Sequence, residues 1–170
     1  MDSLLEWLGS TDFYEAPAST KYHHAVDGGL VIHSLETHEN LRNVVKVFDP
    51  ERFLVSEAEI VIVSLLHDLT KIGFYSKEKR NRKIDGRWVE VEEYAVSDSH
   101  GLGHGSGSVI RIQNFIRLSS AEAAAIRWHM GAWGDDGYSE RQSMNKAMEM
   151  YPLVSMLQMA DLASNYLSKK

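Results

Sequence analysis

Hydrophobic side chains recur at intervals of three and four residues along most of the chain, and this spacing predicts amphipathic helices. The longest pattern ends at Asp49-Pro50, because the residue before a proline disfavours helical geometry. Residues 11–27 contain Pro17 and run into a Gly-Gly pair, so we expect a loop there. The predicted helices cover residues 2–8, 30–48, 57–69, 106–117, 120–130, 139–149 and 152–167.

Two of these helices carry a capping box, in which a serine and a glutamate three residues later satisfy each other's backbone amides. Ser56 and Glu59 precede the run IVIVSLLHDL, and Ser119 and Glu122 precede AAAIRWHM. The first run is apolar on nearly all sides, so its helix should be central to the fold.

Residues 72–96 look different, because the stretches GFYSKEKRNRKI and GRWVEVEEYAV flank Asp85-Gly86. Asp-Gly is a strong signal for a two-residue hairpin turn. We therefore predict an all-α fold, a helical bundle from which one small β-hairpin projects.

Length and composition favour a single domain over residues 1–170. The chain has no apolar run near the ~18 residues of a membrane helix, and its acidic N-terminal stretch does not resemble a signal peptide. We expect no membrane partner and a cytoplasmic location, in a microbe or in a cell infected by a virus. There are no cysteines, so a bound metal needs His, Asp or Glu ligands, which suit Mn, Fe, Co, Ni, Zn or Mg.

The net charge of −6 argues against a general nucleic-acid coat protein. Residues 77–87 are an exception, with six basic and two acidic side chains, which leaves −10 on the rest of the chain. This basic segment has two interpretations of equal standing. It contacts a polyanion, or it protects an exposed strand edge from aggregation.

Several histidines and aspartates occur in apolar helical contexts. The pair His67-Asp68 ends the most hydrophobic helix, where an unpaired charge would cost several kcal/mol, roughly, and a metal ion would remove that cost. Any one such residue is more simply explained as a hydrogen-bonded core group, but four on separate helices indicate a shared site. The candidate ligands are His33, His67, Asp68, His104, His129 and Asp161.

Standard alternatives fail on spacing. His33 and His38 are five residues apart, so they point about 140° apart on a helix and are not expected to share a metal. The chain has no H-E-x-x-H, no Walker lysine after its glycine-rich stretch and no G-x-S-x-G. Zincin, P-loop and serine-hydrolase chemistry are therefore weak hypotheses.

The order of these residues, H…HD…H…H…D, resembles that of the HD superfamily of metal-dependent phosphohydrolases. SLLHDLTKIG resembles the usual LLHDIGKI, with Thr70 in place of glycine, and GHGSGS and AIRWHMG look like the later histidine motifs. APASTKYHHAVDGGLVIHSL is similar to the start of the catalytic region in bacterial 3′-to-5′ exoribonucleases that contain an HD domain. The resemblance covers about residues 14 to 165 and implies an HD-domain helical bundle.

The resemblance implies two divalent metals. The first would be held by His33, His67, Asp68 and Asp161, and the second by His104 and His129, with Asp68 as the bridge. The implied activity is hydrolysis of a phosphoester in a nucleotide or short oligonucleotide by a metal-bound hydroxide. Lys71 matches the lysine of HD-x-x-K, which would contact a phosphate or orient the nucleophile, although a lysine there also suits a helix C-terminus.

Further residues are candidates for substrate binding. His23 and His24 would contact substrate or assist the leaving group, or serve structure alone, and the basic side chains Arg80, Arg82 and Lys83 would hold remote phosphates. Two rival functions remain: a deoxynucleoside triphosphate hydrolase, and a non-catalytic nucleotide sensor on the same fold. A homo-oligomer is compatible with the sequence.

Overall fold

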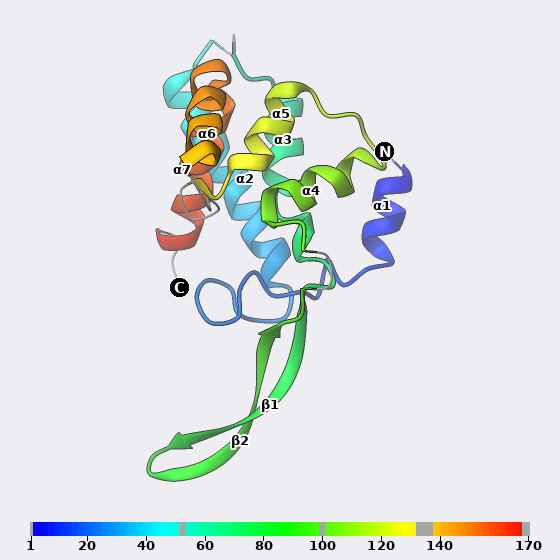
Figure 1. Ribbon diagram of the computed structural model, residues 1–170, viewed down its shortest axis with the longest axis vertical. Coiled ribbons are helices and arrows are strands. Elements are labelled where there is room, and N and C mark those ends of the chain that lie inside the picture. The colour runs from blue at the N-terminus through cyan, green and yellow to red at the C-terminus, as the bar shows by residue number, and fades with distance from the viewer. Residues whose placement is uncertain (1, 52–53, 99–100, 132–137, 168–170) are drawn as a thin grey trace.

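The computed structural model describes residues 2–51, 54–98, 101–131 and 138–167, and shows a mostly helical body with one projecting hairpin (Figure 1). This confirms the predicted combination of helices and a hairpin. The elements in chain order are α1 (Asp2–Gly9), α2 (Gly29–Phe48), α3 (Glu57–Leu66), the 3-10 turn η1 (Leu69–Lys71), β1 (Tyr75–Ile84), β2 (Arg87–Val96), α4 (His104–Gln113), α5 (Ser120–Trp128), α6 (Tyr138–Met150) and α7 (Pro152–Tyr166).

Both predicted capping boxes are present. The Ser56 and Ser119 side chains accept from backbone amides three residues on, and the glutamates Glu59 and Glu122 return the bond to the serine amides. Helix α3 ends directly before the candidate ligand His67, and helix α5 ends directly before His129. The capping boxes fix where these helices begin, and therefore help to set where their last turns lie.

The core lies where α2 packs against α3 and α7, and where α5 packs against α4 and α7. Its fully buried side chains come from most of these helices and include Leu30, Leu41, Ile60, Ile126 and Leu157. Helix α3 is less enclosed than its sequence predicts, since Val61 is 39 % exposed. In the described part of the chain, no helix combines the length and hydropathy that crossing a bilayer requires.

The loop over residues 11–27 crosses the start of α2 at very close range. A Cβ on Gly29 would lie 2.0 Å from the carbonyl oxygen of His24, so only glycine fits there. His24 itself has a φ of 44°, which is uncommon for a residue with a side chain. The close approach holds His24 against the first turns of α2.

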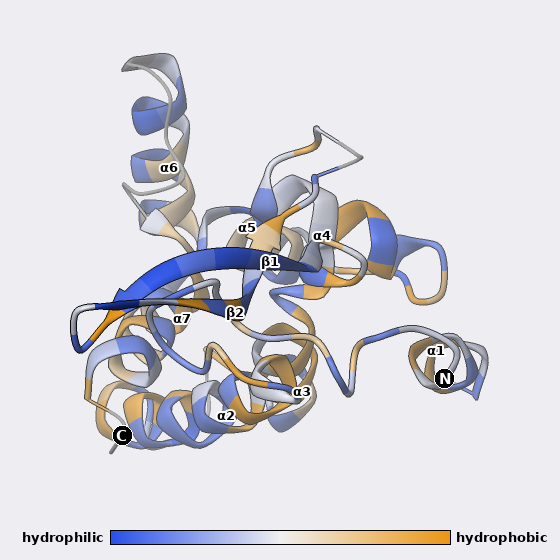
Figure 2. Ribbon diagram, turned by 90° about the horizontal axis from the view of Figure 1, so that it is seen from below, coloured by the Kyte–Doolittle hydropathy of each residue, from blue (hydrophilic) through white to orange (hydrophobic). Residues whose placement is uncertain are grey.

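Strands β1 and β2 form an antiparallel pair whose register runs from Tyr75 opposite Val96 to Ile84 opposite Arg87. Asp85 and Gly86 make the two-residue turn, and both have positive φ, as a primed turn requires. The hairpin leaves the helical body and extends away from it (Figure 1), and β1 is hydrophilic along most of its length (Figure 2).

Candidate metal centre

His67 and His129 occupy equivalent positions, each directly after the last turn of a helix. His67 is the C-cap of α3 and its Nδ1 lies 2.8 Å from the carbonyl oxygen of Ser64. His129 is the C-cap of α5 and its Nδ1 lies 2.7 Å from the carbonyl oxygen of Ile126. The last carbonyls of a helix lack intrahelical partners, so each imidazole donates Nδ1–H to one of them. The Nε2 atom of each ring is thereby left to face the interior.

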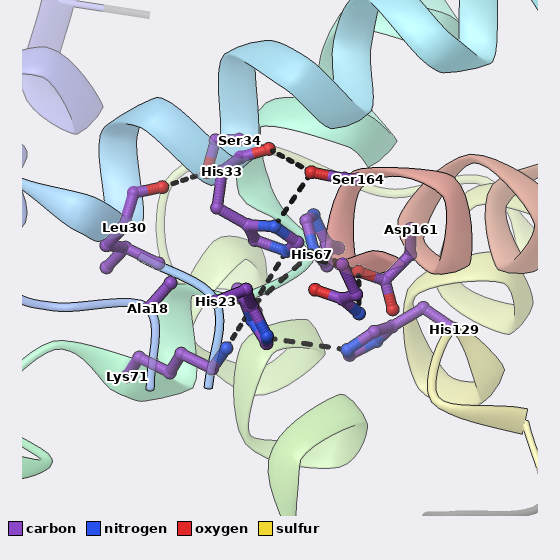
Figure 3. A network of polar contacts seen from close by, with 12 residues as sticks. Ala18, His23, Leu30, His33, Ser34, His67, Lys71, His129, Asp161 and Ser164 are labelled. Carbon is purple, nitrogen blue, oxygen red and sulfur yellow. Dashed lines mark hydrogen bonds and ion pairs between the residues drawn. The ribbon is translucent and has the colours of Figure 1, made fainter. Parts of the chain in front are cut away.

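His33 and Asp161 come from α2 and α7, the helices that pack side by side. His33 Nε2 lies 3.1 Å from Asp161 Oδ1 and 3.1 Å from His67 Nε2. Figure 3 shows the side chains of these residues and of His129 directed toward one another from separate helices.

Asp68 completes the group from the turn between α3 and η1. Its Oδ2 lies 3.5 Å from both His33 Nε2 and His67 Nε2, and its Oδ1 lies 3.4 Å from His129 Nε2. Atoms that share one ion at about 2.0–2.2 Å lie roughly 3.0–3.5 Å apart, so these separations suit ligands of a common metal. The buried group His33, His67 and Asp68, whose ligand atoms all lie within 4.8 Å of one another, can hold a metal ion.

Two atoms in this cluster are buried without a hydrogen-bond partner: His129 Nε2 and Asp68 Oδ1. With its proton on Nδ1, a neutral His129 presents a lone pair to a carboxylate oxygen, and two acceptors cannot bond each other. Buried polar atoms in proteins are nearly always satisfied. A cation that both atoms bind would satisfy them, and the donor set of imidazole nitrogens and carboxylate oxygens suits a divalent transition metal.

The ionisation of the cluster agrees with this interpretation. Burial lowers the pKa of His67 to about 4, which keeps its ring neutral. Burial acts to raise the pKa of Asp161, but its hydrogen bond to His33 and the charges of the surrounding histidines together outweigh burial and lower the pKa to about 2. Burial likewise opposes protonation of His33, yet Asp161 and Asp68 raise its pKa. The carboxylates thus favour positive charge between these rings, as a metal ion provides.

Lys71 is buried beside the cluster, and its Nζ lies 2.6 Å from Asp68 Oδ2. Burial acts to raise the pKa of Asp68, but the Lys71 ammonium, together with the surrounding histidines, outweighs burial and holds that pKa well below its usual range. Arg111 supports this turn by donating from Nη1 to the carbonyls of Leu69 and Ile72, at 2.8 and 2.9 Å.

His104 begins α4 within the glycine-rich stretch, and two of its glycines are required by packing. A Cβ on Gly105 would lie 2.1 Å from the backbone oxygen of Arg127, and one on Gly107 would lie 2.6 Å from Thr70 Oγ1. The absence of side chains at these glycines lets α4 pack closely against α5 and against η1, which follows His67-Asp68. His104 Nδ1 is buried without a partner in the described part of the chain, and burial lowers the pKa of the ring.

Four members of the cluster line a cavity of about 860 Å³: His33, Asp68, His129 and Asp161. His67 is fully buried and is not among the described lining residues. His23 also lines the cavity, as do His104 and Lys71, so the structure brings these three predicted site residues beside the metal ligands. The described lining residues are Ala18, Ser19, Thr20, Tyr22, His23, His33, Asp68, Lys71, Phe74, Tyr75, Val96, His104, His129, Met130, Gly131, Gln158, Asp161, Leu162, Asn165 and Tyr166.

Four predicted substrate-binding residues do not line this cavity. His24 instead faces Glu36, with Nε2 2.8 Å from its carboxylate. Arg80, Arg82 and Lys83 lie on the distal part of β1, which extends away from the helices (Figure 1). Tyr75 and Val96, which pair at the base of the hairpin, line the cavity, whereas Arg80, Arg82 and Lys83 are not among its described lining residues.

Sequence reasoning missed three residues that support the ligands: Arg111, Glu36 and Ser164. Ser164 Oγ lies 3.1 Å from His33 Nδ1 and 3.2 Å from Glu36 Oε2. Ser164 follows Asp161 by three residues, a spacing that places both on one face of α7, and this was the available signal.

Comparisons with family models, curated proteins and solved structures found no match for this chain, so the geometry of the site carries the functional argument.

Proposed function

We propose that this protein is a metal-dependent phosphohydrolase that acts on a nucleotide or short oligonucleotide. The observation that carries the proposal is the convergence of three imidazole Nε2 atoms and two carboxylates in one buried cluster, of which His33, Asp68, His129 and Asp161 line the cavity. Such a centre has at hand the residues for a first metal (His33, His67, Asp68 and Asp161) and, with His104 and His129 nearby, those for a second. A divalent cation bound there supplies positive charge for phosphoryl oxygens and promotes the ionisation of a water.

The chain's own residues prepare the site for this chemistry. Lys71 keeps Asp68 ionised and therefore able to act as a ligand. His23 Nε2 is buried without a hydrogen-bond partner in the described chain, and burial lowers the pKa of the ring to about 4. A neutral imidazole at the cavity wall can donate one hydrogen bond to a phosphoryl or leaving-group oxygen, or accept one from a hydroxyl group.

The cavity favours a substrate with few phosphate charges. Among its described lining residues Lys71 is the one cation other than histidine, and Asp68 already pairs with it. A nucleoside triphosphate carries about four negative charges at neutral pH, and such sites are expected to supply several cationic side chains. Neutral amides and the aromatic rings of Tyr22 and Tyr166 suit a base and sugar better. We therefore favour mononucleotides and short phosphodiesters over deoxynucleoside triphosphates.

The test is a metal titration followed by an activity panel. Protein stripped with a chelator is reloaded with Mn²⁺, Fe²⁺, Co²⁺, Ni²⁺, Zn²⁺ or Mg²⁺ and given nucleoside monophosphates, triphosphates, cyclic dinucleotides and short oligonucleotides. We expect metal-dependent release of phosphate or nucleotide, greatest with singly phosphorylated substrates. His33→Ala should abolish it, whereas His38→Ala, on the same helix but outside the cluster, should not.

Two outcomes would overturn the proposal. Protein that binds no metal in any titration would remove its basis. Protein that binds metal and nucleotide tightly but turns over nothing on the panel would favour the sensor function instead.

A further inference from the structure

The three imidazoles of the cluster differ in the hydrogen-bond partner of Nδ1, the ring nitrogen that faces away from the cluster. His67 and His129 follow the last turn of a helix, where free backbone carbonyls accept their Nδ1–H groups. His33 lies in the second turn of α2, where the carbonyls are used by the helix itself. Its Nδ1 must therefore find a side chain, and it faces the hydroxyl of Ser164 at 3.1 Å.

Ser164 belongs to a chain of hydrogen bonds that runs outward from the cluster. Ser164 is 2 % exposed, and its Oγ lies 3.2 Å from Glu36 Oε2. The same carboxylate oxygen lies 2.8 Å from His24 Nε2. The chain thus links the loop over residues 11–27, helix α2 and helix α7, and Figure 3 shows its inner end at Ser164.

The direction of these bonds determines the tautomer of His33. The carboxylate of Glu36 only accepts, so the hydroxyl of Ser164 donates to it. The other acceptor within reach, the His33 carbonyl at 3.5 Å, would also take the hydroxyl proton. In either arrangement Ser164 accepts from His33 Nδ1–H, and His33 Nε2 keeps its lone pair toward the metal ligands.

We propose that Glu36 and Ser164 are positioning residues for the metal ligand His33, and that His24 holds Glu36 in place. The inference rests on the proposed metal centre. The backbone of His24 is consistent with this role: its φ of 44° is uncommon, its carbonyl oxygen accepts from the Ala18 N–H at 3.0 Å, and the same oxygen lies too close to Gly29 for a Cβ there. His24 is thus assigned to the support of a ligand and not to substrate.

The test measures Co²⁺ affinity by calorimetry and the ligand-field absorption of the bound ion. Ser164→Ala and Glu36→Ala should each weaken Co²⁺ binding by roughly 10- to 100-fold and change the absorption band, because His33 loses its orientation and tautomer. Ser34→Ala is the matched control: Ser34 is a buried serine of α2 that donates only to the Leu30 carbonyl. It should leave both readouts unchanged, and Ser164→Thr should restore most of the affinity.

Glu36 is partly exposed, so its variant addresses the inference even if Ser164→Ala folds poorly. Wild-type affinity and an unchanged band in both Ser164→Ala and Glu36→Ala would overturn the inference while the metal centre stands. Absence of Co²⁺ binding by the wild-type protein would instead refute the metal centre, and the inference with it.

Discussion

The buried histidine–aspartate cluster and the hairpin are both rich in charge, yet their charged side chains are arranged in opposite ways. In the cluster the charged groups are buried, and Asp68 Oδ1 and His129 Nε2 lie 3.4 Å apart, each without a hydrogen-bond partner among the described residues. On the hairpin the charges are exposed and already matched: Arg82 pairs with Glu93 at 2.6 Å and Lys79 with Glu90 at 2.9 Å. The difference separates a buried group that can hold a metal ion from an exposed surface whose charges pair with one another.

The hairpin also shows how a local charge count can mislead. Residues 77–87 have a net charge of +4, but both strands together carry six basic and five acidic side chains over residues 75–96. The register sets Glu92 opposite Lys79, and Glu90 and Glu93 form ion pairs with Lys79 and Arg82. A basic stretch in one strand is therefore nearly neutral once its partner strand is counted.

The largest effect is expected at the centre of the cluster. Asp68→Ala removes a carboxylate that lies within 3.5 Å of three candidate ligand histidines, and it leaves Lys71 buried without its partner. Breaking a buried ion pair lowers the free energy of unfolding by about 3–5 kcal/mol, and metal binding and hydrolysis should be lost. Urea unfolding in the presence of a chelator measures the change in stability, and elemental analysis of the untreated protein measures the loss of metal.

A double variant separates the two losses. Asp68→Ala with Lys71→Met removes the unpaired ammonium, so the free energy of unfolding should recover substantially while metal binding stays absent. A single variant Asp68→Ala that keeps its metal and full activity would show that Asp68 is no ligand.

A smaller effect is expected where the cluster depends on close helix packing. Gly105→Ala would place a methyl group 2.1 Å from a backbone oxygen of α5, and the required shift should cost about 1–3 kcal/mol of unfolding free energy. Gly9→Ala is the control, because a Cβ there meets nothing within 4 Å. Thermal unfolding of the two variants compares them, and equal melting temperatures would contradict the packing argument.

The smallest effect is expected on the hairpin. Arg82→Ala breaks an exposed pair, which should change the free energy of unfolding by less than about 1 kcal/mol. Reversal of Arg80, Arg82 and Lys83 to Glu should leave KM for a mononucleotide unchanged, because these side chains do not line the cavity. A severalfold rise in that KM at low salt would show that these hairpin side chains contribute to substrate binding.

Local signals predicted much of this structure. Capping boxes at Ser56 and Ser119 marked two helix starts, and Asp85-Gly86 marked the turn, because each acts over a few residues. The burial of His33, His67, Asp68, His129 and Asp161 together was predicted from their apolar contexts. The hydrogen-bond partners of His33 could not be predicted from the sequence, because the pairing of Glu36 with Ser164 depends on how α2 and α7 pack. The direction of the hairpin likewise depends on tertiary contacts at its base, such as Tyr75 with the Ala18 carbonyl.

The bond between His33 and Ser164 joins residues 131 positions apart, whereas the hairpin joins neighbours. The two regions should therefore form at different times. A hairpin closed by a two-residue turn forms in roughly 1–10 μs, while contacts distant in sequence wait for the loops between them to close. During synthesis α2 emerges long before α7, so His33 must remain without its serine until nearly all of the intervening chain has left the ribosome.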